Sequence, residues 1–163
     1  MSSESISAAR ELVTYEGWLI DQREWDTWIA LYAEDAEYWL PCWDDEYTIT
    51  QNPNNELSLI YYSSRAGLED RVYRLRTERS LASTPLPRTC HMINIAKITE
   101  DKDRNIIVHS NWTTHAYRLS QAHCFFGQQT HTLRMIDGEL KITKRKVVVA
   151  NDRIPNVLDI YSV

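Results

Sequence analysis

The sequence predicts an α+β fold in which helices near the start pack on the concave face of a curved antiparallel sheet. Apolar residues recur at helical spacing only in the first half of the 163 residues, whereas the second half alternates apolar and polar residues over long stretches. Helices and strands therefore segregate along the chain, as in α+β architectures. No repeat, low-complexity tract or change of composition divides the sequence, and we expect residues 1–163 to form one domain.

The first predicted helix runs from about residue 5 to residue 20. Its residues at helical spacing are Leu12, Tyr15, Glu16 and Leu19. Gly17 lies within this segment and weakens the prediction slightly, because glycine is a poor helix former. We expect the apolar members of the stripe to face the core.

The second predicted helix has a clearer pattern. Four apolar residues recur at the spacing i, i+3, i+4 and i+7, namely Trp25, Trp28, Ile29 and Tyr32. This is the stripe of a helix that packs on a core. We expect the helix to end near residues 34–35, and Pro41 then closes a short strand over residues 36–40.

A strand, a helix and a loop follow. Residues 57–62 are rich in aliphatic and aromatic side chains and predict a strand. Leu68, Val72 and Leu75 recur at i, i+4 and i+7 and predict a helix over residues 67–77. Two prolines exclude regular structure from residues 83–88, which we expect to form an extended loop.

The rest of the sequence predicts a four-stranded antiparallel meander. Its strands are expected over residues 89–99, 106–119, 123–136 and 139–150. Asp137 and Gly138 form a strong hairpin signal, and Gly127 predicts a bulge or bend. This order of elements resembles the cystatin-like, nuclear transport factor 2-like cone, a fold that both enzymes and passive subunits use.

Composition argues against several classes of protein. A net charge of −5 gives no support to nucleic-acid binding, and no apolar run approaches the roughly 18 residues of a membrane span. The first residues lack the layout of a signal peptide. Cys42, Cys90 and Cys124 are an odd number without a CxxC pair, which indicates reduced thiols and a cytoplasmic protein. Six Trp and nine Tyr against two Phe favour half-buried and interface positions.

The common catalytic and metal-binding motifs are missing from the sequence. An iron–sulfur centre with two Cys and two His needs CxH and CxxH pairs, and no histidine follows any cysteine at either spacing. No glycine-rich phosphate loop and no GxSxG elbow occurs. The five histidines are His91, His109, His115, His123 and His131. Adjacent strands can bring some of them together at a metal, but structural or surface roles are the favoured interpretation.

The residues alone leave two functions open, besides the subunit role considered below. Cone-shaped domains can house a small isomerase or dehydratase that uses an Asp–His pair in a cavity. The candidates for such a pair and its neighbours are Asp21, Asp26, Asp35, His91, His109, and Tyr61 or Tyr62. The alternative is that these acids cap helices and face water. A ligand-binding or scaffold module without chemistry is the third hypothesis.

The segment of residues 61–88 is rich in arginine and contains no lysine. Its candidate interface residues are Tyr61, Tyr62, Arg65, Arg71, Arg74, Arg76, Arg79 and Arg88. The interleaved acids Glu69, Asp70 and Glu78 permit a solvated helix face with weak intrahelical ion pairs. Arginine, however, is preferred over lysine at interfaces because its planar group makes bidentate contacts. The nearby tyrosines also favour a docking surface.

Three sequence blocks resemble the small (β) subunits of bacterial aromatic-ring-hydroxylating dioxygenases of the benzoate and anthranilate class. The first block is REWD at residues 23–26 through LYAED at residues 31–35. The second, and most specific, is SLIYY at residues 58–62 through GLEDRVYRLRT at residues 67–77. The third is the loop STPLPRT at residues 83–89. The similarity continues more loosely to residues 150–152.

The resemblance implies a mainly structural subunit. Such subunits assemble with a large α subunit as three α and three β, with β–β trimer contacts. The α subunit carries the Rieske 2Fe–2S cluster and a mononuclear Fe(II), and NADH supplies electrons through a separate reductase. The complex converts an aromatic carboxylate to a cis-dihydrodiol. Benzoate is the favoured substrate, with anthranilate and 2-halobenzoate as alternatives. The resemblance implies no catalytic residue, cofactor or metal in this chain.

Overall fold

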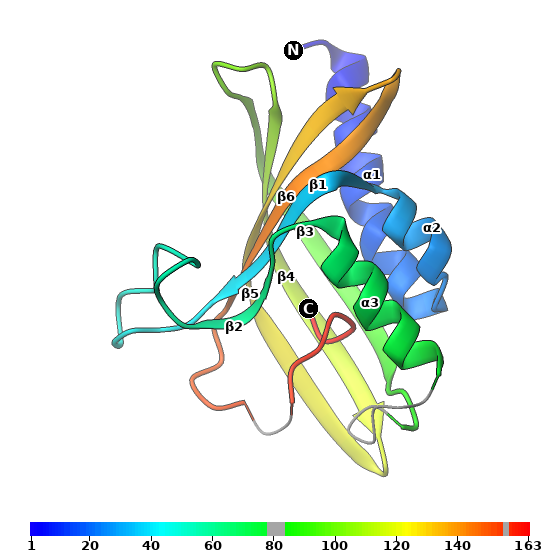
Figure 1. Cartoon of the computed structure of the whole chain (residues 1–163), viewed down its shortest axis with the longest axis vertical. Helices are drawn as coiled ribbons and strands as arrows, with labels where there is room; N and C mark the ends of the chain where they lie inside the picture. The colour runs from blue at the N-terminus through cyan, green and yellow to red at the C-terminus, as the bar shows by residue number, and fades with distance from the viewer. Residues whose placement is uncertain (78–83, 155–156) are drawn as a thin grey trace.

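The helices gather on one side of a single curved sheet (Figure 1). The computed structural model describes residues 1–77, 84–154 and 157–163. In chain order the elements are α1 (Ser3–Gln22), α2 (Trp25–Ala30), β1 (Tyr32–Pro41), β2 (Ser58–Tyr62), α3 (Arg65–Arg76), β3 (Arg88–Glu100), β4 (Ile106–Arg118), β5 (Gln121–Ile136) and β6 (Glu139–Val149). None of the helices in these ranges is long and apolar enough to cross a membrane.

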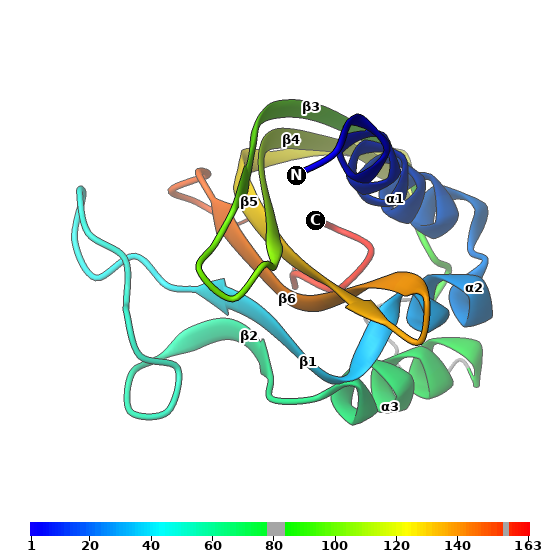
Figure 2. The same ribbon diagram turned by 90° about the horizontal axis from the view of Figure 1, so that it is seen from above.

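The six-stranded sheet has the order β2-β1-β6-β5-β4-β3. Strands β3 to β6 each pair antiparallel with the next, which confirms the predicted meander. β1 pairs antiparallel with β2 but parallel with β6, so the sheet is antiparallel at every pair but that one. Seen from above, the long strands curve around the interior that α1 lines (Figure 2). The α+β, cone-shaped fold predicted from the sequence is confirmed.

Two of the three meander connections are two-residue turns. Asp137 and Gly138 both have positive φ angles, 50° and 83°, as a two-residue hairpin turn requires, and the prediction there is confirmed. Leu119 and Ser120 form a second such turn between β4 and β5, with φ angles of 49° and 64°. The predicted strand boundaries at residues 119 and 123 were wrong here, because neither residue type signals a left-handed turn.

The second helix ends earlier than predicted. α2 stops at Ala30, and Tyr32 begins strand β1 instead of completing the helical stripe. The backbone N–H of Ile142 donates to the carbonyl of Leu31 at 2.8 Å, and Tyr32 pairs with Ile142 in the parallel β1–β6 ladder. Pairing with a strand more than a hundred residues away therefore overrides the local helical spacing.

Helix α1 packs on β3 through a close approach at Gly17. A Cβ atom at this position would lie 3.0 Å from Cδ1 of Ile93 and 3.2 Å from Cβ of His91. The predicted stripe is right for Leu19, which is buried, but wrong for Tyr15, which is 44% exposed. Glu16 of the predicted stripe is also buried, and the rest of the buried face consists of Ala9, Val13, Gly17 and Ile20.

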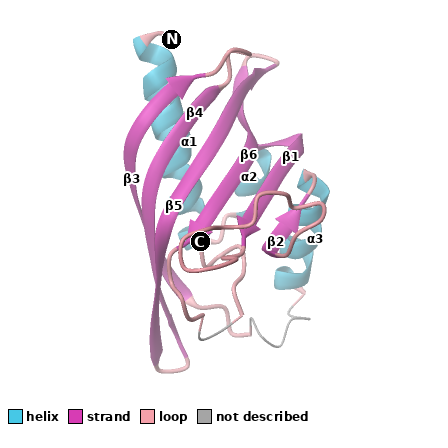
Figure 3. Ribbon diagram, turned by 90° about the vertical axis from the view of Figure 1, so that its left-hand side faces the viewer, coloured by secondary structure: helices cyan, strands magenta, loops and turns pink. Residues whose placement is uncertain are grey.

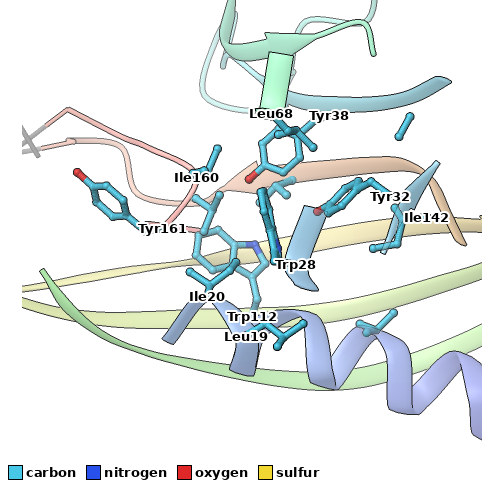
Figure 4. Close-up of a cluster of buried hydrophobic side chains, with 14 of the residues drawn as sticks. Leu19, Ile20, Trp28, Tyr32, Tyr38, Leu68, Trp112, Ile142, Ile160 and Tyr161 are labelled. Atoms are coloured by element: carbon cyan, nitrogen blue, oxygen red, sulfur yellow. The ribbon is translucent and has the colours of Figure 1, made fainter. Parts of the chain in front are cut away.

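The core lies between the helices and the concave face of the sheet. Trp28, Tyr32 and Tyr38 form a chain of aromatic contacts, with ring centroids 5.1 Å and 6.3 Å apart. Figure 4 shows these rings with Leu19 and Ile20 of α1 and, from the end of the chain, Ile160. The C-terminal residue lies inside the curve of the sheet (Figure 2). The last residues of the chain are thus part of the core.

Candidate functional site

The two tyrosines of the predicted interface face opposite sides of β2. The hydroxyl of Tyr61 donates to the Glu37 carboxylate at 3.2 Å. The ring of Tyr62 packs toward Tyr38, with centroids 6.2 Å apart, and so belongs to the core side. Successive side chains on a strand point in opposite directions, so these neighbours do not share one surface.

Three of the arginines hold α3 to the rest of the molecule. Arg65 donates to the carbonyl of Tyr32 at 3.1 Å, Arg76 to the carboxylate of Asp26 at 2.8 Å, and Arg71 through two nitrogens to the carboxylate of Asp159. These contacts join α3 to β1, α2 and the end of the chain. Their guanidinium groups therefore have a clear structural role within the subunit.

The remaining arginines are more open. Arg74 is 61% exposed in its side chain and lies 3.3 Å from Asp70 one helical turn earlier. Arg88 is exposed at the start of β3, opposite Tyr117 of β4. Arg79 lies outside the described residues. The described members of the predicted set lie on β2, α3 and β3, and Tyr62, Arg71 and Arg74 line one hollow.

One of the predicted Asp–His pairs forms. His91 Nδ1 lies 2.5 Å from Oδ1 of Asp21. Asp26 and Asp35 bind the arginines Arg76 and Arg134 instead. The predicted His109 lies beside Thr130, 3.3 Å from its hydroxyl. Only the Asp21–His91 pair therefore meets among the proposed partners in the described part of the chain.

Both carboxylate oxygens of Asp21 and both ring nitrogens of His91 have polar partners. Asp21 also accepts the backbone N–H of His91 and the hydroxyl of Thr89, each at 2.8 Å. Burial alone would raise the pKa of Asp21, but the hydrogen bonds from His91 outweigh it and lower the pKa. The other ring nitrogen of His91 lies 3.2 Å from the carbonyl oxygen of Val163. The side chains of His91 and Asp21 are only 3% and 14% exposed, so the pair is largely closed to solvent.

A buried polar cluster occupies the middle of the core. No local pattern in the sequence shows that its residues meet. The carboxylate of Glu16 accepts hydrogen bonds from Trp28 Nε1 at 3.0 Å and from the Tyr32 hydroxyl at 2.5 Å. Arg145 donates to it at 2.9 Å, and His131 Nε2 lies 3.2 Å away. We call these five residues the Glu16 cluster. Glu16 and His131 have no exposed surface, and Arg145 has 1%.

The charges in the Glu16 cluster are set by its neighbours. Burial alone would raise the pKa of Glu16, but the positive charge of Arg145 and the hydrogen bond from His131 hold it far below its usual range. Burial lowers the pKa of His131 more than Glu16 raises it. Glu16 and Arg145 are therefore an ion pair at neutral pH and His131 is uncharged. The sequence signal for this cluster was Glu16, an acidic residue at a position whose helical spacing predicts burial.

The outer face of the sheet lies away from the helices (Figure 3). It carries cross-strand rows of residues that contain no acid, lysine or arginine. The cross-strand rows are Cys90–His115–Cys124, Met92–Thr113–Phe126 and Asn94–Asn111–Gln128. We call them the uncharged outer face. Met92 and Phe126 are half exposed and line, with Trp43, a hollow of about 710 Å3. Depletion of charge with enrichment of Met and aromatic residues is typical of the centre of an interface.

The described residues do not provide a metal site. They contain no group of three His, Cys, Asp or Glu side chains placed to hold an ion. Cys90 and Cys124 pair with His115 from opposite sides, so β4 separates the two thiols. Cys42 lies beyond the end of β1. The residues of this chain therefore do not fit a Rieske cluster, which needs two Cys and two His around one pair of irons.

Comparison with known proteins places the chain among oxygenase subunits. The family model described as "Ring hydroxylating beta subunit" matches residues 15–156. The 2-halobenzoate 1,2-dioxygenase small subunit of Burkholderia cepacia is 47% identical over 91% of this chain and 90% of its own length. The anthranilate 1,2-dioxygenase small subunit of Acinetobacter baylyi is 40% identical over the full length of both chains.

A solved structure agrees with both relatives. The beta subunit of benzoate 1,2-dioxygenase from Burkholderia mallei superposes with a TM-score of 0.79 at 34% identity, covering 100% of this chain and 98% of that one. The resemblance inferred from residues 58–77 is thereby confirmed. The chain belongs to the family of ring hydroxylating beta subunits, which are components of aromatic-ring dioxygenases.

Proposed function

We propose that this chain is the small subunit of a terminal oxygenase that adds O₂ to an aromatic ring bearing a carboxylate. The observation that carries the proposal is the full-length similarity to small subunits named for 2-halobenzoate, anthranilate and benzoate dioxygenases. The three named substrates share a benzene ring with a carboxylate. The product class is a cis-dihydrodiol, and the host compartment is the cytoplasm.

The proposal assigns the chemistry to a large α subunit. That subunit would hold the Rieske 2Fe–2S cluster and the mononuclear Fe(II), because the described residues of this chain offer no ligand set for either. NADH would supply the electrons through a separate reductase. The complex would contain three α and three β chains, and this chain would give it structural support.

Co-expression with a large-subunit partner tests the proposal. We expect a hexamer-sized complex that contains iron and consumes O₂ with benzoate, 2-chlorobenzoate or anthranilate only when both chains and the reductase are present. Size-exclusion chromatography, iron analysis and oxygen uptake are the measurements. A chain that stays apart from every large subunit, or that binds a stoichiometric iron–sulfur cluster alone, contradicts the proposal.

We propose that the large subunit docks on the side of the molecule that carries α3, where Arg74 and Tyr73 are exposed. Arg65, Arg71 and Arg76 would then hold the docking helix in place. In the same co-expression experiment, Arg74→Glu should reduce co-purification with the large subunit. The thermal stability of the isolated variant chain should change little, because the exposed pair between Arg74 and Asp70 contributes little to folding. Tyr47→Asp, at a loop position that is 87% exposed, is the control.

The uncharged outer face is proposed as the contact between copies of this chain. Amide side chains carry both donors and an acceptor, so Asn94, Asn111 and Gln128 can pair with polar groups of a neighbouring copy without needing a charged partner. This face lies on the opposite side of the sheet from the helices (Figure 3), so both kinds of contact can form together.

A charge at the centre of this face should separate the copies. We expect Phe126→Asp to convert the isolated chain from an oligomer to a monomer, because a carboxylate buried between subunits would lose its hydration without gaining a partner. Sedimentation velocity on the isolated chain is the measurement. An isolated wild-type chain that is already monomeric, or a variant that keeps the wild-type size, would exclude this face as the contact.

A further inference from the structure

The interior of the cone is filled by the end of the chain. Residues 159–163, here called the closing segment, are all buried, with exposed fractions between 0% and 8%. They follow β6 on the concave side, and the C-terminal residue lies within the curve of the sheet (Figure 2). Ile160 and Val163 belong to the main hydrophobic cluster, and Figure 4 shows Ile160 among its side chains.

The closing segment forms a compact turn in which three of its backbone N–H groups bond within the segment. The N–H of Ser162 donates to the carbonyl of Asp159 at 2.9 Å. The N–H of Ile160 donates to the carboxylate of Asp159 at 2.8 Å, and the N–H of Asp159 donates to the hydroxyl of Ser162 at 3.2 Å. A self-satisfied turn with an apolar tip can enter a core without leaving unpaired polar groups behind.

Two polar contacts hold the closing segment in place. At its start, Asp159 binds the guanidinium of Arg71 from α3. At its end, the oxygen of Val163 lies 3.2 Å from Nε2 of His91, whose other nitrogen faces Asp21. Both ring nitrogens of His91 thus face oxygen atoms. At this position Val163 presents an oxygen acceptor that is joined to an apolar side chain.

A hollow borders the closing segment. It has a volume of about 220 Å3 and is lined in part by Pro87, Ala116, Phe125 and Tyr161. The space occupied by the segment therefore continues toward the ends of β4 and β5. Without residues 159–163, the opened space would border the imidazole of His91, the guanidinium of Arg71 and the walls of the hollow, which include Arg118 and His123.

We propose that the concave interior is a latent binding site for a small apolar carboxylate, which the chain keeps closed with its own closing segment. Ile160 and Val163 occupy the volume of the ligand body, and the oxygen of Val163 occupies the position of the ligand carboxylate at His91. The Asp21–His91 pair is the recognition element of this site. The inference is independent of the subunit role, because it concerns the isolated chain.

Deleting residues 159–163 should open the site. We expect the shortened chain to bind 2-naphthoate at least about tenfold more tightly than the full chain, a difference that tryptophan fluorescence resolves because Trp28 lies in the same cluster. 2-Methylnaphthalene has the same apolar body without the carboxylate. In the shortened chain, His91→Phe should weaken binding of 2-naphthoate about tenfold and leave 2-methylnaphthalene unaffected.

A second variant covers the case in which the shortened chain does not fold. The Asp159→Asn variant keeps the full length of the chain but weakens the contact with Arg71. It should bind 2-naphthoate more tightly than the wild type. Asp35→Asn, which weakens the exposed ion pair with Arg134, is the matched control and should not. Near-ultraviolet circular dichroism reports whether each variant is folded. Folded variants that bind no better than the wild type, or binding that ignores His91→Phe, would overturn the proposal.

Discussion

Glu16→Ala is expected to destabilise the chain by about 3–5 kcal/mol, the range for removing one partner of a buried ion pair. The guanidinium of Arg145, fully buried, would lose its compensating carboxylate, and the Tyr32 hydroxyl and the indole N–H of Trp28 would each lose an acceptor. Domains of this size have total stabilities of about 5–15 kcal/mol. Urea unfolding of the isolated chain, followed by tryptophan fluorescence, measures the loss.

The expected coupling between Glu16 and Arg145 provides the control. A double variant, Glu16→Leu with Arg145→Met, removes both charges and should be more stable than either single variant. Single losses that simply add would show that the two side chains do not act as a pair.

Acid titration of the wild type gives a second signature of the Glu16 cluster. Because the pKa of Glu16 is lowered by folding, its contribution is present at neutral pH and is lost as the pH falls below the ordinary carboxyl pKa of 4.5. Glu16→Gln should lack this part of the acid dependence. A variant with the same acid profile as the wild type would mean that Glu16 is not ionised in the folded chain.

Local signals in the sequence were sufficient for most of the fold. The spacing of Trp25 and Trp28 identified a core helix, and Asp137–Gly138 identified a hairpin, because each depends only on residues nearby. Tyr32 continued the same helical spacing, yet it lies in a strand. Its conformation follows from pairing with β6, and nothing near Tyr32 in the sequence encodes that partner.

The polar groups of the interior were beyond prediction for a related reason. Glu16 and Arg145 are 129 residues apart, and Asp21 and His91 are 70 residues apart. Both contacts depend on which strand lies beside α1 and with which register. The sequence named Asp21 and His91 as candidates by residue type, but only the fold shows that they meet and that Val163 covers them.

Gly127→Ala is expected to have the second large effect, a loss of about 3 kcal/mol, at the upper end of the range for overpacking. The sequence predicted a bulge or a bend here, and the β4–β5 and β5–β6 registers pass through Gly127 without a shift, so a bulge is absent. The glycine instead permits a close backbone approach. A Cβ atom would lie 2.0 Å from the carbonyl oxygen of Val148 and 3.0 Å from the nitrogen of Ala150. Because both atoms belong to the backbone of the β6 end, neither can rotate away.

Gly138→Ala separates this steric cost from the general cost of replacing a glycine. Gly138 has a φ of 83°, and a Cβ there meets no atom within 4 Å. Its replacement should cost only the roughly 1–2 kcal/mol of a left-handed backbone in a residue with a side chain. Urea unfolding of both variants should therefore rank Gly127→Ala as the more destabilised. Equal losses of stability would mean that the β6 backbone shifts at Val148 to make room for the added Cβ atom. The close approach of β6 to β5 at Gly127 would then contribute little to stability.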